Sequence, residues 1–341
     1  MKILVTGGAG YIGSHTIVDL VEQGFEVVSA DNFLRASPKQ LEGVAAIVGK
    51  PIKNYAIDIC DKQALYTLFE TEKNIAAIIH FAALKSVGES VHEPSLYYTN
   101  NIQSLVNVLD AAADFGVKNV IFSSSCSVYG NTTELPVTEE TPLQRAESPY
   151  GHTKQIGEDM IRHYAKKYTH INYILLRYFN PAGAHGSAKI GEVSFGRPIY
   201  LTPVIMEVAM GRMPVLNVFG TTYPTRDGSC VRDFIHILDL ADAHTKCLQY
   251  LQKQENETNC EVFNVGAGAG VTVLEAIKAF EKATKQPLNT NFSPPRAGDV
   301  VAIYSDYSKA KTKLGWQPQY TIEDIMKTAW QWEQTHNKLA E

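Results

Sequence analysis

The apolar positions of the N-terminal half follow two alternating patterns. Short continuous apolar runs occur first, and between them lie longer segments whose apolar residues recur three or four positions apart. The first pattern is typical of strands that are buried on both faces, and the second of helices with one buried face. The expected strands are residues 2–6, 26–30, 55–59, 76–81 and 120–122, and the expected helices are residues 12–21, 35–48, 95–115 and 150–169.

This alternation predicts a Rossmann-type α/β fold, in which helices cover both faces of a doubly wound parallel sheet. The alternation breaks up after Pro181, where glycine, proline and turn residues become frequent. We therefore expect a nucleotide-binding Rossmann domain in residues 1–180 and a smaller mixed α/β substrate lobe in residues 181–341, with segments of the lobe free to return to the sheet. The amphipathic stretch 321–336 is expected to serve packing.

Composition limits the classes of partner. The 341-residue chain has a formal net charge of -5, which disfavours nucleic acid or an anionic membrane as its main partner. Its apolar runs are shorter than the roughly 20 residues of a membrane span, and its first run is too short for a signal peptide. The five cysteines are scattered, as expected for reduced thiols in the cytoplasm, and neither they nor the ten histidines cluster, so we expect no metal.

A glycine-rich turn follows the first strand directly. Such a turn lets backbone N–H groups approach a pyrophosphate at a helix N-terminus, where the helix dipole favours anions. Asp31 ends the second strand, where its carboxylate would accept hydrogen bonds from the adenosine ribose and repel a 2′-phosphate, so the expected cofactor is NAD rather than NADP. The candidate cofactor residues of this unit are Gly7, Gly10, Tyr11, Ile12, Gly13, Asp31 and Asn32.

Other polar residues stand at the ends of later strands. Asp58 is placed to reach the adenine amine, although it is equally suited to cap the helix that follows. Lys85 suits a phosphate, with a solvated lysine as the ordinary alternative. Ser123, Ser124 and Ser125 place hydroxyls at the cofactor crevice or, alternatively, cap a loop.

Tyr150 and Lys154 are four residues apart in a helix that Pro149 opens, so their side chains share a face. A tyrosine, with a pKa of ~10, needs roughly 4 kcal/mol of preference for its anion to ionise near pH 7. One positive charge about 7 Å away, at an effective dielectric of about 20, gives ~2.4 kcal/mol. Lys154 supplies one such charge and an oxidised nicotinamide ring would supply a second. The pair therefore predicts a phenolate acid/base beside NAD, and a chance Tyr-x-x-x-Lys is the alternative.

Five segments together resemble the extended short-chain dehydrogenase/reductase family. They are Thr6 to His15, His80 to Ser90, Ser148 to Lys154, Arg177 to Pro181 and Asp227 to Asp233. The resemblance covers nearly the whole chain and is strongest to members that epimerise UDP-glucose and UDP-galactose at carbon 4. It implies tightly held NAD, a UDP-hexose substrate and a transient 4-keto sugar.

The resemblance also implies roles for single residues. Tyr150 would be the acid/base, Lys154 would also hold the nicotinamide ribose, and Ser125 would bridge Tyr150 to the 4-hydroxyl of the sugar. The positions that match the family's cofactor contacts are Asp31, Asp58, Ile59, Phe81, Ala82, Lys85, Asn100 and Phe179. The positions that match its UDP-sugar contacts are Lys85, Ser125, Asn180, Tyr200, Leu201, Asn217, Phe219, Arg232, Arg296, Asp299 and Ile303.

Some of these substrate positions have competing interpretations. Arg232 and Arg296 suit a diphosphate and Asp299 a ribose, although a surface ion pair is the ordinary alternative. Tyr200 and Ile303 depart from the family pattern, which often has Asn at the first position and Tyr or a small residue at the second. Ile303 leaves space for an N-acetyl group at carbon 2, and Tyr200 takes space back. Epimerisation of a UDP-N-acetylhexosamine or a UDP-pentose is therefore the alternative activity.

Two other functions compete with epimerisation. Nucleotide-sugar dehydratases of this family carry Asp-Glu after the strand-end hydroxyl, where this chain has Cys126 and Ser127, which disfavours a dehydratase or reductase. A non-catalytic NAD-binding regulator is disfavoured because Tyr150, Lys154 and Ser125 are all present. The resemblance further implies a homodimer formed through the helices at 95–115 and 150–169.

Overall fold

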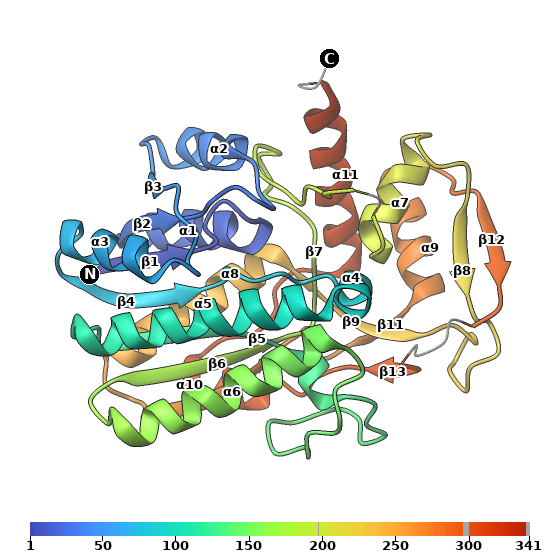
Figure 1. Cartoon of the computed structure of the whole chain (residues 1–341). Helices are drawn as coiled ribbons and strands as arrows, with labels where there is room; N and C mark the ends of the chain where they lie inside the picture. The colour runs from blue at the N-terminus through green and yellow to red at the C-terminus, as the bar shows by residue number, and fades with distance from the viewer. Residues whose placement is uncertain (197, 296–299, 339–341) are drawn as a thin grey trace.

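A seven-stranded parallel sheet forms the centre of the computed structural model, which describes residues 1–196, 198–295 and 300–338 (Figure 1). Its strand order is β10-β6-β5-β4-β1-β2-β3, so the winding direction reverses between β1 and β4. The Rossmann-type prediction is thus confirmed. The strands are β1 (Lys2–Thr6), β2 (Glu26–Ala30), β3 (Lys53–Tyr55), β4 (Ile75–His80), β5 (Asn119–Ser125), β6 (Asn172–Tyr178) and β10 (Cys260–Val265).

The third strand is the one that the apolar pattern misplaced. It was expected over residues 55–59, but β3 ends at Tyr55 and the chain then turns. The strand lies at the sheet edge and pairs with β2 alone within the described residues, so it is short and half-exposed rather than a buried apolar run.

Helices form one layer on each face of the sheet, and each layer encloses a separate hydrophobic core. Apolar residues spaced three or four apart turn one side of each helix toward the sheet. The first layer contains α1 (Tyr11–Glu22), α2 (Pro38–Val48), α8 (Ile237–Gln252) and α10 (Ser308–Leu314). The second contains α3 (Lys62–Thr71), α5 (Pro94–Asp114) and α6 (Pro149–Lys167), with α5 and α6 side by side (Figure 1).

A smaller lobe stands at the carboxyl end of the sheet and has its own core (Figure 1). The expected packing helix at 321–336 is present as α11, whose Ile325, Ala329 and Trp332 are buried. The other elements here are β7 (Asn180–Ala182), α7 (Leu201–Ala209), β8 (Leu216–Phe219), β9 (Val231–His236), β11 (Gly270–Thr272), α9 (Val273–Thr284), β12 (Thr290–Ser293), β13 (Ala302–Ile303) and α11 (Ile322–Lys338). Two short helical segments, α4 (Val87–His92) and η1 (Cys126–Tyr129), follow β4 and β5.

The chain passes repeatedly between the sheet and the small lobe. From β9 it enters α8 on the large sheet, continues into β10 beside β6, and then returns to β11 and α9. Asp233 of β9 fixes this junction: its buried carboxylate accepts hydrogen bonds from the amides of Ala267 (2.7 Å) and Ser305 (2.9 Å). The two parts are therefore held in one relative position by shared strands and a buried carboxylate.

Across the three described ranges, the helices are all too short or too polar to cross a lipid bilayer.

Candidate active site

The crevice at the winding reversal is built by the turn after β1 and the turn after β4. Gly7 has φ +71, and a Cβ there would lie 2.8 Å from the Ala82 amide nitrogen. A Cβ at Gly13 would lie 2.2 Å from the Gly7 carbonyl oxygen. A side chain at either position would clash with this neighbouring backbone. Both glycines are therefore required for the turn to pack beside Phe81 and Ala82.

The start of α1 and the end of β2 fit a dinucleotide. Gly10 caps α1 without a side chain, and the first turn, residues 11–14, is uncharged, which leaves the positive end of the helix dipole facing the crevice. The Ala9 amide donates to Oδ2 of Asp31 (3.0 Å) and the Phe33 amide to Oδ1 (2.8 Å). A carboxylate accepts about four hydrogen bonds, so Asp31 retains capacity for ribose hydroxyls.

The structure excludes one of the two interpretations of Asp58, namely that it caps the helix that follows. Asp58 is exposed and accepts from the Cys60 amide (2.8 Å), while the N-cap of α3 is Asp61, whose carboxylate accepts from the Ala64 amide. Capping therefore does not account for Asp58. Ile59 is buried beside it, and Cys60 donates from its thiol to the Asn100 carbonyl, which brings the predicted residues 58, 59 and 100 together.

Lys85 lies where β4 and the small lobe meet. Its ammonium pairs with Glu192 (3.2 Å) and stands 5.8 Å from the ring centroids of both Tyr11 and Tyr200. The Tyr200 hydroxyl donates to the Lys85 carbonyl (3.1 Å). Lys85 is exposed but not merely solvated, because its ammonium is paired with the Glu192 carboxylate.

The predicted catalytic residues converge where β5 ends against the start of α6. Ser148 caps α6 by accepting from the Gly151 amide (3.1 Å). Lys154 is buried, donates to the Ser123 carbonyl (2.5 Å) and lies 5.8 Å from the Tyr150 ring centroid. The Tyr150 hydroxyl lies next to the Ser125 side chain, which acts to lower its pKa. Ser125 also caps η1 by accepting from the Ser127 amide (3.2 Å). The capping role predicted for the serine run is therefore confirmed for Ser125.

Burial controls the protonation of this pair. It lowers the pKa of Lys154 to about 7, while the charge of Glu158 acts in the opposite direction. It also raises the pKa of Tyr150, with Tyr200 adding to the rise and Ser125 opposing it. The expected phenolate is therefore not a property of the chain alone. Positive charge or hydrogen bonds brought by ligands are needed to ionise Tyr150, because Lys154 is itself only partly charged near neutral pH.

The predicted substrate residues lie in several different surroundings. Phe179 and Ile303 are buried in one cluster with Cys126 at its edge, and Arg232 donates to the carbonyls of Val231 (2.9 Å) and Val300 (2.7 Å). Asn180 has a buried Oδ1 without a hydrogen-bond partner in the described parts of the chain, as expected for a group that awaits a ligand.

The remaining substrate candidates are more scattered. Tyr200 and Leu201 begin α7, while Asn217 and Phe219 lie on β8, where the side chain of Asn217 accepts from Asn291 (3.1 Å). Arg296 and Asp299 lie outside the described residues.

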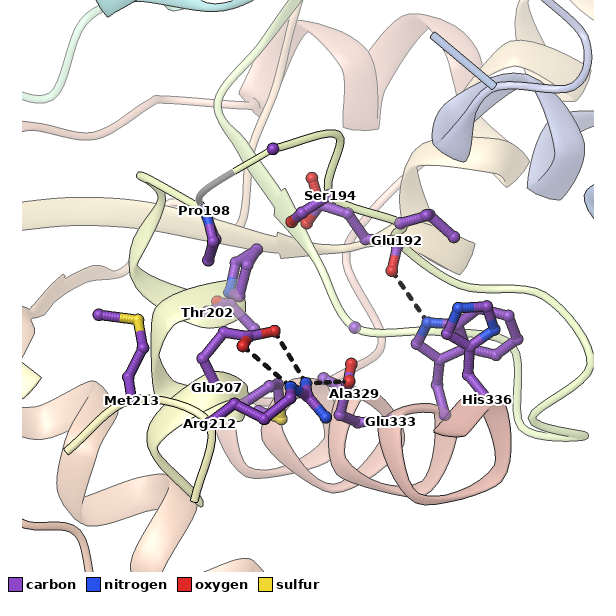
Figure 2. A pocket seen from close by; sticks show the side chains of 16 residues that line it. Glu192, Ser194, Pro198, Thr202, Glu207, Arg212, Met213, Ala329, Glu333 and His336 are labelled. Carbon is purple, nitrogen blue, oxygen red and sulfur yellow. Dashed lines mark hydrogen bonds and ion pairs between the residues drawn. The ribbon is translucent and has the colours of Figure 1, made fainter. Parts of the chain in front are cut away.

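A cavity of about 430 Å³ lies between α7 and α11 (Figure 2). Figure 2 shows Arg212 held between Glu207 and Glu333, and the Trp332 indole donates to the Glu192 carbonyl (2.9 Å). Tyr150, Lys154 and Ser125 are outside this cavity. Its link to the crevice is Glu192, which sequence reasoning missed because its partner Lys85 is 107 residues away.

The fold and the crevice define a class: a Rossmann-type nucleotide-binding enzyme with a buried tyrosine–lysine pair. A family model described as GDP-mannose 4,6 dehydratase matches residues 4–329. The chain belongs to this family of extended short-chain dehydrogenases/reductases.

Within the family, the chain is similar to UDP-glucose 4-epimerase of Bacillus subtilis strain 168, with 44% identity over 98% of both chains. Two solved structures are also similar. One is UDP-glucose 4-epimerase from Bifidobacterium longum in complex with NAD+ and UDP (42% identity, 99% of both chains, TM-score 0.94). The other is UDP-glucose-4-epimerase from Stenotrophomonas maltophila with NAD and formylated UDP-arabinopyranose (40% identity, 99% of both chains, TM-score 0.96).

The lowered pKa of Lys154 means that its charged form reduces the free energy of unfolding. The unfolded state holds the lysine proton up to pH ~10.4, whereas the folded state releases it near pH 7, so the cost is full below pH 7 and disappears as the pH rises. We expect Lys154→Met to raise the free energy of unfolding of the ligand-free protein by roughly 2–4 kcal/mol at pH 6.5, and by less at pH 10.

Chemical denaturation at both pH values measures this difference. Lys166→Met, an exposed change on the same helix, serves as the control and should leave stability unaltered. A lower stability of Lys154→Met at pH 6.5 would contradict the cost assigned to the buried ammonium.

Proposed function

We propose that the protein is an NAD-dependent 4-epimerase of UDP-hexoses, interconverting UDP-glucose and UDP-galactose through a transient 4-keto sugar. The observation that carries this proposal is the contact of Tyr150 with Ser125 beside the buried Lys154, at the mouth of the dinucleotide crevice. The close relatives and the NAD-bound neighbours support the same activity.

The chain's own residues account for the proton steps. Bound NAD supplies a reversible hydride acceptor for carbon 4 of the sugar. Tyr150 removes the proton of the 4-hydroxyl as the hydride leaves, and returns a proton after the hydride comes back to the other face of the carbon. Ser125 holds the hydroxyl that reacts, and Lys154 stabilises the phenolate by its charge.

Return of hydride to the other face requires the keto sugar to turn while UDP stays in place. The proposed division has Arg232 binding the diphosphate and the hexose meeting few strong polar contacts. Arg296 and Asp299 share in holding UDP under this proposal, as their sequence positions suggest.

Tyr200 and Ile303 decide which sugars fit. Ile303 is buried and part of the wall formed with Phe179, and a bulkier residue there would narrow the hexose space. Tyr200 is anchored at the start of α7 by its hydrogen bond to the Lys85 carbonyl, and under this proposal it takes back part of the hexose space. We propose UDP-hexoses as the preferred substrates, with UDP-N-acetylhexosamines and UDP-pentoses as the alternatives; the pentose derivative bound by the Stenotrophomonas neighbour favours testing both.

A dehydratase activity is disfavoured by the chemistry at Cys126. Elimination of water needs an additional acid and base after the strand-end hydroxyl. Burial raises the pKa of the Cys126 thiol to about 12, so the thiol stays protonated and is not a base at neutral pH.

Incubation of the purified protein with UDP-galactose, UDP-N-acetylgalactosamine and UDP-xylose, without added NAD, tests the activity and its preference. We expect UDP-galactose to be converted to UDP-glucose faster than either alternative substrate is epimerised. Accumulation of a 4-keto-6-deoxy sugar would instead identify a dehydratase, and NAD binding without any turnover would identify a non-catalytic protein.

Removal of the proposed acid/base tests the catalytic assignment. We expect Tyr150→Phe to retain NAD but to lose turnover by about 10²–10⁴-fold, because proton transfer is lost while the crevice is intact. Tyr168→Phe, at the far end of α6, should keep normal turnover. Nearly normal turnover in Tyr150→Phe would refute the role of this phenol.

We further propose a cytoplasmic homodimer formed through α5 and α6. The two helices lie side by side (Figure 1) and carry half-buried apolar residues that belong to none of the hydrophobic cores, namely Ile102, Val106 and Ile156. Such a seam is suited to a second copy, because two α5–α6 pairs would bury it in a four-helix bundle.

We expect Ile156→Lys to convert the dimer to a monomer by placing a charge in this seam. Light scattering gives the mass of each species, with Lys166→Glu on the exposed side of α6 as the control. A monomeric unmodified protein would overturn the dimer proposal.

A further inference from the structure

Three side chains of α6, one helical turn apart, contact the end of β5. The proton steps described above use the first two, Tyr150 and Lys154, but not the third, Glu158. Ser125 contacts Tyr150, and the Ser123 carbonyl accepts from Lys154. One helical turn beyond Lys154, the carboxylate of Glu158 accepts a hydrogen bond from the Ser124 hydroxyl (2.6 Å). Residues at spacing four share a helix face, so all three contacts are made by one side of α6.

We propose that Glu158 is a positioning residue for the reaction: its buried carboxylate fixes the end of β5 against α6 and places a negative charge one helical turn from Lys154. This inference rests on the proposed epimerase function, in which Lys154 stabilises the phenolate. It assigns to Glu158 no contact with substrate or cofactor.

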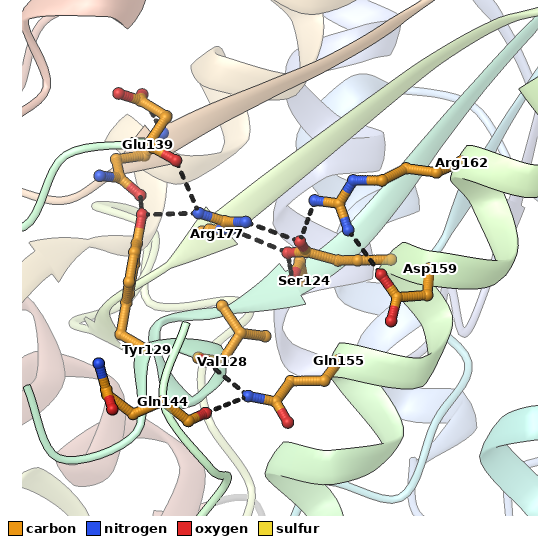
Figure 3. Close-up of polar contacts among 11 residues, drawn as sticks. Ser124, Val128, Tyr129, Glu139, Gln144, Gln155, Asp159, Arg162 and Arg177 are labelled. Carbon is orange, nitrogen blue, oxygen red and sulfur yellow. Dashed lines mark hydrogen bonds and ion pairs between the residues drawn. The ribbon is translucent and has the colours of Figure 1, made fainter. Parts of the chain in front are cut away.

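The carboxylate is itself fixed by two arginines. Arg177 on β6 makes a bidentate pair with Glu158, through Nε to Oε1 (2.9 Å) and Nη2 to Oε2 (2.7 Å), and both side chains are buried. Arg162 adds a third contact from α6 itself (2.8 Å). Figure 3 shows Arg177 and Arg162 approaching the same point from opposite sides, next to Ser124. A carboxylate with this many donors has one defined position.

Arg177 is held in turn by groups on other elements. Its Nη1 donates to the Tyr129 hydroxyl (3.0 Å), and Tyr129 donates to the Asn264 side chain on β10 (2.6 Å). The network therefore spans η1, α6 and three neighbouring strands, β5, β6 and β10 (Figure 3). A fully hydrogen-bonded buried network of this kind specifies a single arrangement of the elements that it joins.

The charge of Glu158 acts on Lys154 through the same interior. Burial works to raise the pKa of Glu158, but the hydrogen bonds and charge of Arg177 outweigh it and lower this pKa, so Glu158 stays anionic. Its negative charge favours the ammonium form of Lys154 against the burial that disfavours it.

In the ligand-free protein, the other titratable groups around Lys154 are neutral near pH 7. His80 of β4 has a pKa lowered by burial to about 3, and burial raises the pKa values of Tyr178 on β6 and Tyr150 on α6. Of the described residues that face Lys154, Glu158 is thus the one that supports its positive charge.

Glu158→Gln tests the charge with the least change of shape, since glutamine still accepts from Ser124. The matched control is Asp159→Asn, which removes the adjacent carboxylate, also an Arg162 partner (3.0 Å), without touching Ser124 or Arg177. The measurements are kcat and KM of the NAD-loaded enzyme with UDP-galactose from pH 6 to 10, together with NAD content.

In Glu158→Gln we expect the alkaline limb of the kcat profile to move down by about one pH unit, with KM changed less than about threefold, because Lys154 loses its proton more easily. A second readout needs no turnover: the ultraviolet phenolate titration of Tyr150, taken as the difference from the same protein carrying Tyr150→Phe. Measured on the NAD-loaded protein, this titration should move up by about one unit in Glu158→Gln, since the phenolate has lost part of its stabilising charge. Asp159→Asn should reproduce the unmodified protein in both measurements.

Ser124→Ala distinguishes the positioning effect of Glu158 from the effect of its negative charge. It removes the tether to β5 but leaves the Glu158 charge, so we expect kcat to fall several-fold at every pH without a shift of the alkaline limb. This variant also keeps the proposal testable if Glu158→Gln does not fold, in which case an unchanged kcat in Ser124→Ala would overturn it.

The possible failures are distinguishable. If the unmodified protein epimerises UDP-galactose but neither the alkaline limb nor the phenolate titration moves in Glu158→Gln, the role of Glu158 is refuted and the proposed function stands. If the unmodified protein epimerises no UDP-sugar, the proposed function fails, and the phenolate titration still decides whether Glu158 controls the charge beside Tyr150.

Discussion

A lysine ammonium buried at the end of β5 is the constraint around which this site is arranged. Lys154 donates one short hydrogen bond to the Ser123 carbonyl, yet its surroundings lower its pKa to about 7. Such a group persists only where the surrounding structure leaves it no alternative position. Here β5, α6 and the Glu158–Arg177 pair provide that rigid surrounding.

The same burial explains why the chain alone does not hold a reactive phenolate. Desolvation disfavours both the Lys154 cation and the Tyr150 anion. Each side chain therefore favours its neutral form until a group of opposite charge lies beside it. A ligand that carries positive charge into the crevice favours the Tyr150 anion, and that anion in turn favours the cationic form of Lys154. The proposed chemistry therefore depends on cofactor binding, because Tyr150 stays protonated in the ligand-free site.

The interleaved path of the chain gives the crevice its two walls. The glycine turn, Asp31 and Lys85 follow the carboxyl ends of strands of the large sheet. Arg232, Ile303 and Tyr200 belong to the small lobe. Because β9 leads into α8 and β10 completes the large sheet, the two walls are covalently and sterically linked. The Lys85–Glu192 pair adds a polar contact across the gap between them.

The sequence by itself determined the features that depend on near neighbours in the chain. Strand and helix periods predicted the sheet and its two helical layers, the glycine spacing predicted the nucleotide turn, and the spacing of Tyr150 and Lys154 placed both on one helix face. These are local properties, because they follow from backbone geometry over a few residues. The short edge strand β3 escaped this reasoning because edge strands lack the apolar run of a buried strand.

Tertiary structure alone decided which distant groups meet and how strongly each is buried. It paired Lys85 with Glu192 and Glu158 with Arg177, and it returned β10 to the large sheet beside β6. It also set the pKa values of Tyr150 and Lys154, since desolvation depends on the packing around a group and not on its place in the sequence.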